Sequence, residues 1–195
     1  MKIKIILGST RPNRFSEKVG KWIYEMIKKR GIDIEILDLR DYPLPFFNEP
    51  ISPAEIKNGS YPNKVARKWA SKIREADAFI IVSPEYNHGI PAVLKNALDY
   101  IYHEWNKKPV GFVSYGSLGG VRAVEQLRQI CIGLEMIPIP KSLHILNHWQ
   151  LLDEKGNLKK GAFAPLRKKA VAFLEQFVSL AKALKSAKNR LRQRK

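Results

Sequence analysis

Short apolar segments alternate with longer amphipathic ones along most of this sequence, and this alternation restricts the fold more than any other feature. The apolar segments span residues 2–8, 34–39, 78–82, 110–113 and 135–139, and each has the length of a strand. The third is apolar throughout, as expected for a parallel strand that is buried on both faces. Pro138 and Pro140 suggest that the fifth strand lies at the edge of the sheet.

The segments between and after these strands have the periodicity of helices with one apolar face. They cover residues 16–30, 64–75, a stretch that begins at Pro91 and whose apolar stripe ends at Tyr102, residues 119–132 and residues 165–187. Strands that alternate with helices in this way predict a parallel sheet covered by helices on both faces. We therefore expect a three-layer α/β fold.

Length and composition are those of one globular domain. The chain has 195 residues, of which 45% are hydrophobic, and this suffices for a single core. No apolar run approaches the ~20 residues that a membrane-spanning helix needs, so we expect no membrane partner. The chain starts with an alternating strand rather than a secretion signal, and Cys131 is its single cysteine. Both features favour a cytoplasmic protein.

The net charge of +17 is large for this length, and part of it is concentrated at the end of the sequence. No acidic residue follows Glu175, whereas the basic residues after it are Lys182, Lys185, Lys188, Arg190, Arg192, Arg194 and Lys195. We favour one domain over residues 1–187 and a solvated basic tail over residues 188–195. Contact of this tail with nucleic acid or an acidic partner is the alternative.

Residues 40–63 form a long segment without clear periodicity, with prolines at positions 43, 45, 50, 53 and 62. Structureless loops of this length are uncommon in compact domains and are often functional. An ordinary surface loop is one interpretation. We favour a loop that walls the active site or reaches a second subunit.

The segment from Gly8 to Ser16 links the first strand to the first helix and is rich in groups that bind phosphate. Its side-chain donors are Ser9, Thr10, Arg11, Arg14 and Ser16. Free backbone N–H groups and the positive end of the helix dipole also point into such a loop. We predict a phosphate site here. The plainer alternative is a polar loop with Ser16 as the helix N-cap.

The glycine pattern limits the kind of phosphate. After Gly8 the next glycine is Gly20, so the G-x-G-x-x-G dinucleotide fingerprint is absent, as is G-x-x-x-x-G-K-[ST]. Asp38 ends the second strand, where dinucleotide folds carry a ribose-binding acid, but without the glycines this signal is weak. What remains is a terminal phosphate monoester, as FMN offers.

Two further loops leave the carboxyl ends of strands, where ligands bind in open α/β sheets. The loop over residues 83–91 offers aromatic rings for a planar ligand and amides for its polar edge. It contains Pro84, Glu85, Tyr86, Asn87, His88 and Gly89. The loop over residues 114–120 contains Tyr115 and Gly116, and its glycines let the backbone approach a ligand closely. Together the three loops predict one flavin pocket.

Other candidate sites are weaker. His144 and His148 are four residues apart, as two metal ligands on a helix would be, but Pro138 and Pro140 argue against a helix there, so we expect no metal. Cys131 falls on an apolar helix face and is expected to be a buried, inert thiol. At the end of a helix, His103 and its neighbours suit capping and packing better than a catalytic dyad.

The three loops resemble those of the NADPH-dependent FMN reductase family, which belongs to the flavodoxin-like superfamily. The resemblance covers roughly residues 2–140. Its motifs are Gly8-Ser9-Thr10-Arg11, Pro84 to Pro91 followed by Leu94-Lys95-Asn96-Ala97-Leu98-Asp99, and Ser114-Tyr115-Gly116 with Gly119-Gly120. Two further stretches, His103-Glu104-Trp105 with Lys108-Pro109 and Leu44-Pro45-Phe46-Phe47, look like the branch of small quinone and azo-dye reductases.

The resemblance implies a flavodoxin-like fold whose five-stranded parallel sheet has the order 2-1-3-4-5. It implies that Ser9, Arg11 and Ser16, with help from Arg14, hold the FMN phosphate. Residues 84–89 would hold the isoalloxazine, and Tyr115 with Gly116 would close its other side. Members of the family are usually dimers or tetramers with FMN near the subunit interface, so we expect a homodimer or homotetramer.

We therefore expect hydride transfer from NADPH or NADH through bound FMN to a small-molecule acceptor of the flavin, quinone or azo type. Both half-reactions would use one site, and no side-chain acid or base should be essential, because the cofactor carries the chemistry. The alternative function is a flavin-binding interaction protein whose basic surface or tail binds nucleic acid or an acidic partner. An electron-transfer flavodoxin fits poorly, since those proteins are usually acidic.

Overall fold

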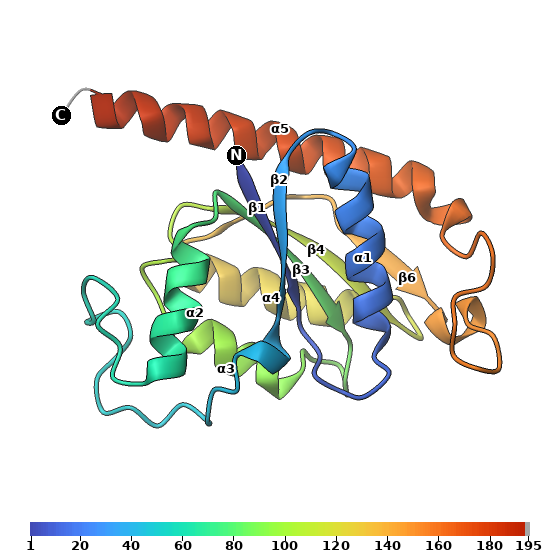
Figure 1. The fold of residues 1–195 in the computed structure, drawn as a ribbon, viewed down its shortest axis with the longest axis horizontal. Coiled ribbons are helices and arrows are strands. Elements are labelled where there is room, and N and C mark those ends of the chain that lie inside the picture. Colours follow the sequence, from blue (N-terminus) through green and yellow to red (C-terminus); the bar gives the residue numbers. More distant parts are fainter. Residues whose placement is uncertain (194–195) are drawn as a thin grey trace.

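The computed structural model describes residues 1–193, which form a three-layer α/β fold (Figure 1). Arg194 and Lys195, the end of the predicted basic tail, lie outside the described residues. The strands of the central parallel sheet are β1 (Lys2–Leu7), β2 (Asp33–Asp38), β3 (Ala78–Pro84), β4 (Pro109–Gly116), β5 (Ile137–Pro138) and β6 (Leu143–Leu146). Their order, β2-β1-β3-β4-β5, confirms the predicted order.

The edge of the sheet beyond β4 differs from the predicted single strand. β5 pairs only with the start of β4, whereas β6, which was not predicted, pairs in parallel with residues Val113–Gly116 at its end. Pro138 and Pro140 lack the N–H groups of a continuous ladder, so the chain leaves the sheet and rejoins it further along β4. The segment after β6 is thereby brought to the carboxyl ends of the strands.

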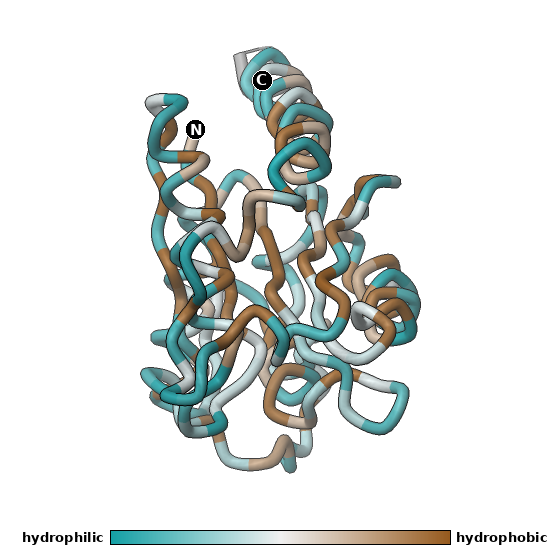
Figure 2. The backbone as a smooth tube through the Cα atoms, turned by 90° about the vertical axis from the view of Figure 1, so that its right-hand side faces the viewer, coloured by the Kyte–Doolittle hydropathy of each residue, from teal (hydrophilic) through white to brown (hydrophobic). Residues whose placement is uncertain are grey.

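Helices cover both faces of the sheet, as predicted. α1 (Phe15–Lys28) and α5 (Arg167–Gln193) pack on one face, and α2 (Lys64–Arg74), α3 (Ala92–Asp99) and α4 (Val121–Gly133) pack on the other (Figures 1 and 2). Successive side chains of a strand point to opposite faces, so each strand serves two cores. In β3, for example, Phe79 and Ile81 join the α2–α4 core, while Ile80 and Val82 join the α1–α5 core.

Two helices end more than two residues from the predicted position. α3 ends at Asp99, before the end of the predicted apolar stripe at Tyr102, and α5 continues to Gln193, past residue 187. The last part of α5 contains neither Gly nor Pro and is rich in strong helix formers, which explains its extension. None of the helices in residues 1–193 has the length and apolarity needed to cross a membrane.

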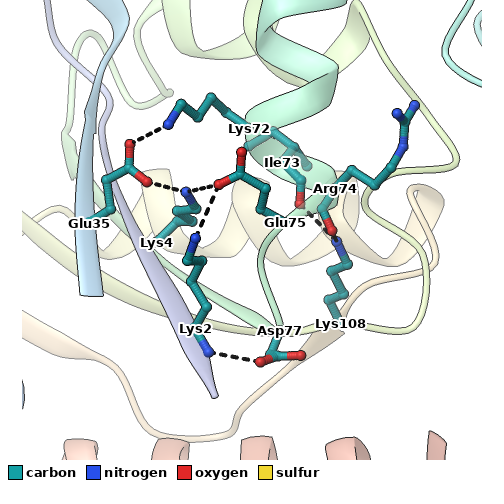
Figure 3. A network of polar contacts seen from close by, with 9 residues as sticks. All are labelled: Lys2, Lys4, Glu35, Lys72, Ile73, Arg74, Glu75, Asp77 and Lys108. Carbon is teal, nitrogen blue, oxygen red and sulfur yellow. Dashed lines mark hydrogen bonds and ion pairs between the residues drawn. The ribbon is translucent and has the colours of Figure 1, made fainter. Parts of the chain in front are cut away.

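Ion pairs toward the amino ends of the strands fasten α2 to the sheet (Figure 3). Lys4 of β1 is fully buried, and its Nζ atom pairs with Glu35 and, at 2.9 Å, with Glu75. Lys72 of α2 donates to Glu35 at 2.9 Å. Burial alone would raise the pKa of the Glu35 carboxyl, but the hydrogen bonds from Lys4 and Lys72 outweigh burial and lower that pKa. This network lies away from the loops at the carboxyl ends.

Candidate functional site

The loops after β1, β3 and β4 enclose one cavity of about 350 Å³ at the carboxyl ends of the strands. Residues 11–15 line it from the first loop, residues 84–86 from the second, and residues 115–117 from the third. The structure therefore brings together the three segments on which the sequence-based interpretation depends. No residue of the described 40–63 segment lines this cavity, so the predicted wall is not formed within the single chain.

The first loop enters α1 without a side-chain cap. The N-cap residue is Arg14, whose side chain makes no capping hydrogen bond. Ser16, the alternative cap, lies in the first helical turn with its Oγ atom buried and without a partner among the described residues. Its backbone N–H donates instead to the Tyr115 hydroxyl at 3.1 Å. An uncapped helix start beside a hydroxyl without a partner has the features of an anion site.

Arg14 gives the first loop its shape. Its guanidinium group is buried, forms two hydrogen bonds with Asp38, one of them at 2.8 Å, and donates to the Ser9 carbonyl at 2.7 Å. Burial alone would raise the pKa of the Asp38 carboxyl, but hydrogen bonds from Arg14 and from the Arg40 backbone outweigh it and lower that pKa. Because Asp38 is bonded to Arg14, its carboxylate is not free for a ribose hydroxyl.

Arg11 and Ser9 connect the first loop to the second. The Ser9 Oγ atom lies 3.0 Å from the Tyr86 hydroxyl, and the Arg11 guanidinium carbon lies 5.7 Å from the centre of the Tyr86 ring. Arg11 is exposed and forms no ion pair with any acid in residues 1–193. Arg40 braces the loop from outside by donating to the carbonyls of Thr10 and Arg11. Arg11 therefore presents an unneutralised charge at the cavity.

Glu85 anchors the second loop to α4. Its carboxylate accepts hydrogen bonds from the Arg122 backbone N–H at 3.0 Å and from the Arg122 side chain at 3.1 Å. The carboxylate thus caps the start of α4, where its charge is favourable because of the helix dipole. Although Glu85 lines the cavity, its side chain is already bonded, and its role in the site is to position the loop.

The rest of the second loop is a tight turn. Tyr86 and Gly89 exchange two backbone hydrogen bonds of 2.9 Å, and Asn87 and His88 between them adopt left-handed φ angles of 48° and 69°. Of the residues expected to hold the isoalloxazine, Pro84, Glu85 and Tyr86 line the cavity. The exposed turn residues Asn87 and His88, with Gly89, lie beside it.

His144 fastens the third loop to β6. The Ser114 hydroxyl donates its proton to the Gly119 carbonyl at 2.7 Å, and the His144 Nδ1 atom lies 2.9 Å from the hydroxyl oxygen. Because the hydroxyl has only one proton, His144 Nδ1 is the donor in the bond between His144 and Ser114. The Ser142 Oγ atom lies 2.7 Å from the His144 Nε2 atom, which accepts its proton. His144 is therefore part of the scaffold. In the described part of the chain, no three His, Cys, Asp or Glu residues are grouped as metal ligands.

Gly120 allows this loop to lie close to β4, and replacing it with alanine should destabilise the fold by about 2 kcal/mol. Its φ angle is 76°, and an added Cβ atom would lie 2.7 Å from the Ser114 Cβ atom and 3.0 Å from the Tyr115 backbone nitrogen. Gly133→Ala is the matched control, because a Cβ atom there meets nothing within 4 Å. Urea unfolding of both variants measures the difference, and equal midpoints would contradict this explanation.

Acid should destabilise the protein through His144 and His148. Burial lowers the pKa of both imidazoles in the folded chain. Below a pH of about 6.5, the two histidines therefore bind more protons in the unfolded chain than in the folded one. The stability that is present above that pH is lost as the pH falls through the folded pKa values. The urea midpoint should decrease from pH 7.5 to pH 5.5, and His144→Asn should reduce the decrease. A loss of the same size in that variant would show that His144 does not contribute.

A fourth wall of the cavity was not predicted. It consists of His148, Trp149 and Leu152, which follow β6 in and after the short helix η2 (His148–Leu151). The His148 ring centre lies 5.0 Å from that of Phe15 and 4.9 Å from that of Tyr115. The short apolar run Leu143 to Leu146, interrupted only by His144, was the available signal for β6, but the prolines before it obscured the strand.

Comparisons with known proteins identify the family of this chain. The family model of NADPH-dependent FMN reductase matches residues 1–150. An NAD(P)H-dependent FMN reductase of Schizosaccharomyces pombe is 43% identical over 140 residues, covering 71% of this chain and 70% of that protein. An NADPH:quinone oxidoreductase of Arabidopsis thaliana is 34% identical over 167 residues, covering 81% of this chain and 82% of that protein.

A solved structure shows the same fold. The flavoenzyme NAD(P)H:(acceptor) oxidoreductase FerB of Paracoccus denitrificans superposes with a TM-score of 0.69 at 20% identity, covering 91% of this chain and 97% of that one. The chain thus has a flavodoxin-like fold and belongs to the NADPH-dependent FMN reductase family. It is an FMN-dependent NAD(P)H oxidoreductase, as predicted. The comparisons do not support the alternative of a flavin-binding interaction protein.

Proposed function

We propose that this reductase binds FMN in the cavity of the three loops, with the phosphate at the start of α1 and the isoalloxazine beside Tyr86 and Tyr115. One observation carries the proposal. Among the described residues, the buried side-chain polar atoms without a partner are Arg14 Nε, Ser16 Oγ and His148 Nδ1. Arg14 and His148 line this cavity, and Ser16 lies in the first turn of α1, next to the lining residue Phe15. Buried polar atoms normally have partners, so their grouping fits a ligand rich in oxygen atoms.

The cavity residues provide position and electrostatics. Bound FMN would supply the hydride chemistry between NAD(P)H and an acceptor. Arg11 and the start of α1 supply positive charge for the phosphate, and the rings of Tyr86 and Tyr115 supply flat surfaces. Burial raises the pKa of Tyr115 to about 12, so this hydroxyl keeps its proton at neutral pH. Tyr115 is therefore not a general base at that pH.

We further propose that quinones are acceptors and that the active form is a homodimer or homotetramer. The name of the Arabidopsis relative supports a quinone. Exposed apolar side chains support self-association, since such groups mark interfaces. In the 40–63 segment, Phe46 is 81% exposed and Ile51 is 49% exposed. These residues suit the predicted contact with a second subunit. Light scattering after size-exclusion chromatography would measure the oligomeric state.

Steady-state kinetics without oxygen test the proposed reaction. FMN-loaded protein is mixed with NADPH or NADH and a water-soluble quinone, and both concentrations are varied. A single site for both half-reactions predicts ping-pong kinetics, which appear as parallel lines in double-reciprocal plots. Intersecting lines would contradict the single site. An FMN-loaded protein that oxidises NADPH but leaves quinones unchanged would contradict the acceptor.

A further inference from the structure

His148 lies outside the motifs from which FMN contacts were predicted, yet the fold holds it firmly at the cavity. β6 pairs with the end of β4, and the Asn147 backbone N–H donates to the Gly116 carbonyl at 2.9 Å. Asn147 itself adopts a left-handed φ angle of 45°, which turns the chain into η2 at His148. The segment after β6 is thus attached to the third loop, and His148 becomes part of the fourth wall.

The His148 ring lies at the end of the cavity where α1 begins. Its neighbours are Phe15, the first residue of α1, and Tyr115, with ring centres 5.0 Å and 4.9 Å away. The Tyr115 hydroxyl in turn accepts a hydrogen bond from the Ser16 backbone N–H in the first turn of α1. The contact with Phe15, and the bond that ties Tyr115 to Ser16, place the His148 ring beside the start of α1, where the phosphate is proposed to bind.

Packing alone does not explain a histidine at this position. Its Nδ1 atom is buried and has no hydrogen-bond partner in residues 1–193. A phenylalanine would fill the same aromatic cluster without leaving a buried nitrogen unbonded, which is unfavourable. The contrast with His144 is clear, because both ring nitrogens of that residue have partners.

The charges around His148 favour an anion as the missing partner. Glu85 is the one carboxylate among the residues that line the described cavity, and it is bonded to Arg122. Asp38, behind the first loop, is bonded to Arg14. The cavity therefore offers His148 no free carboxylate, whereas Arg11 contributes an unpaired positive charge.

We propose that His148 is a cofactor-retention residue whose imidazole donates a hydrogen bond to the phosphate of FMN. This inference rests on the proposed FMN site and adds to it a ligand from the segment after β6. Burial lowers the pKa of His148, so the ring is neutral at pH 7 and acts there as a hydrogen-bond donor. A hydrogen bond from His148 to the phosphate would favour binding of FMN over riboflavin, which has the same ring system without the phosphate.

Paired titrations with FMN and riboflavin test this role. His148→Phe keeps an aromatic ring but removes the donor, and it should raise the Kd for FMN about 10-fold or more. The Kd for riboflavin should change less than about 2-fold, because the lost bond is to the phosphate. His148→Gln restores a donor and should recover part of the FMN affinity. His103→Phe is the control, since His103 is exposed and its Nε2 atom lies 2.9 Å from the Ala54 carbonyl oxygen.

The possible results separate this proposal from the broader one. Equal losses for FMN and riboflavin in His148→Phe, or no loss for either, would overturn the role of His148 while leaving the FMN site intact. Wild-type protein that binds FMN no more tightly than riboflavin would overturn the proposed phosphate site itself. If His148→Phe folds poorly by circular dichroism, His148→Gln and His148→Ala replace it as the pair. Equal FMN affinity in those two variants would again contradict the proposal.

Discussion

Replacing Arg14 with alanine is expected to lower the free energy of unfolding by about 3 kcal/mol. The Arg14 side chain is only 2% exposed, and its removal leaves the Ser9 carbonyl without its donor and the Asp38 carboxylate with only the hydrogen bond from the Arg40 backbone N–H. Breaking one partner of a buried pair is costly because the remaining charge stays desolvated. Urea unfolding at pH 7 without added FMN, followed by tryptophan fluorescence, measures the change.

Two controls define what the Arg14 result means. Arg11→Ala removes an exposed arginine from the same loop and should change the stability by less than about 0.5 kcal/mol. Combining Arg14→Ala with Asp38→Asn removes the stranded charge, so the double variant should be more stable than Arg14→Ala alone. A loss below about 1 kcal/mol in Arg14→Ala would mean that the pair does not organise the loop.

Replacing Arg11 with alanine is expected to weaken FMN binding by about 10-fold to 100-fold, the range for hydrogen bonds that involve a charged group. Arg11 lines the cavity, and no acid in the described residues neutralises its charge. Its guanidinium group is therefore free to form an ion pair with the phosphate. The rate of hydride transfer in the FMN-saturated variant should change far less, because Arg11 is assigned to the phosphate and not to the reacting ring.

Fluorescence titration gives the FMN affinity of the Arg11 variant, and stopped-flow reduction by NADPH gives its hydride-transfer rate. Arg30→Ala is the matched control, since Arg30 is exposed just after the opposite end of α1. Riboflavin binding should be nearly unaffected in both variants. Unchanged FMN affinity after Arg11→Ala would exclude the phosphate assignment.

Periodicity made the main part of the fold predictable. The run from Ala78 to Val82 is buried on both faces, and the stripes of α1 and α2 face the two cores as expected. These are local patterns that the sequence displays directly. Cys131 is buried on α4, and burial raises the pKa of its thiol to about 12, as an inert thiol requires.

Features that depend on long-range pairing were not predictable in the same way. β6 exists because β4 offers a free edge after β5 ends, and no local pattern reports that edge. The bond of Arg14 to Asp38 joins residues that are 24 positions apart, so residue types alone could not show that Arg14 is occupied. The same reason hid His148, whose environment is created by α1, β4 and η2 together.

The second loop shows how far the roles of single side chains can be predicted from composition. Its composition indicated a flavin-binding segment, and the structure places Pro84, Glu85 and Tyr86 at the cavity. The turn conformation of Asn87 and His88 depends on the two backbone bonds between Tyr86 and Gly89, which composition does not reveal. Which of these residues touch FMN therefore stays a prediction, and so do residues 188–195 as a separate tail.

The most direct test of the central claim is a visible spectrum of the purified protein after incubation with FMN and gel filtration, followed by titration with NADPH without oxygen. If the three loops form an FMN site, the protein retains a flavin absorbance band, and about one equivalent of NADPH bleaches it. A protein that emerges colourless, or that keeps a flavin band which NADPH does not bleach, would contradict the account.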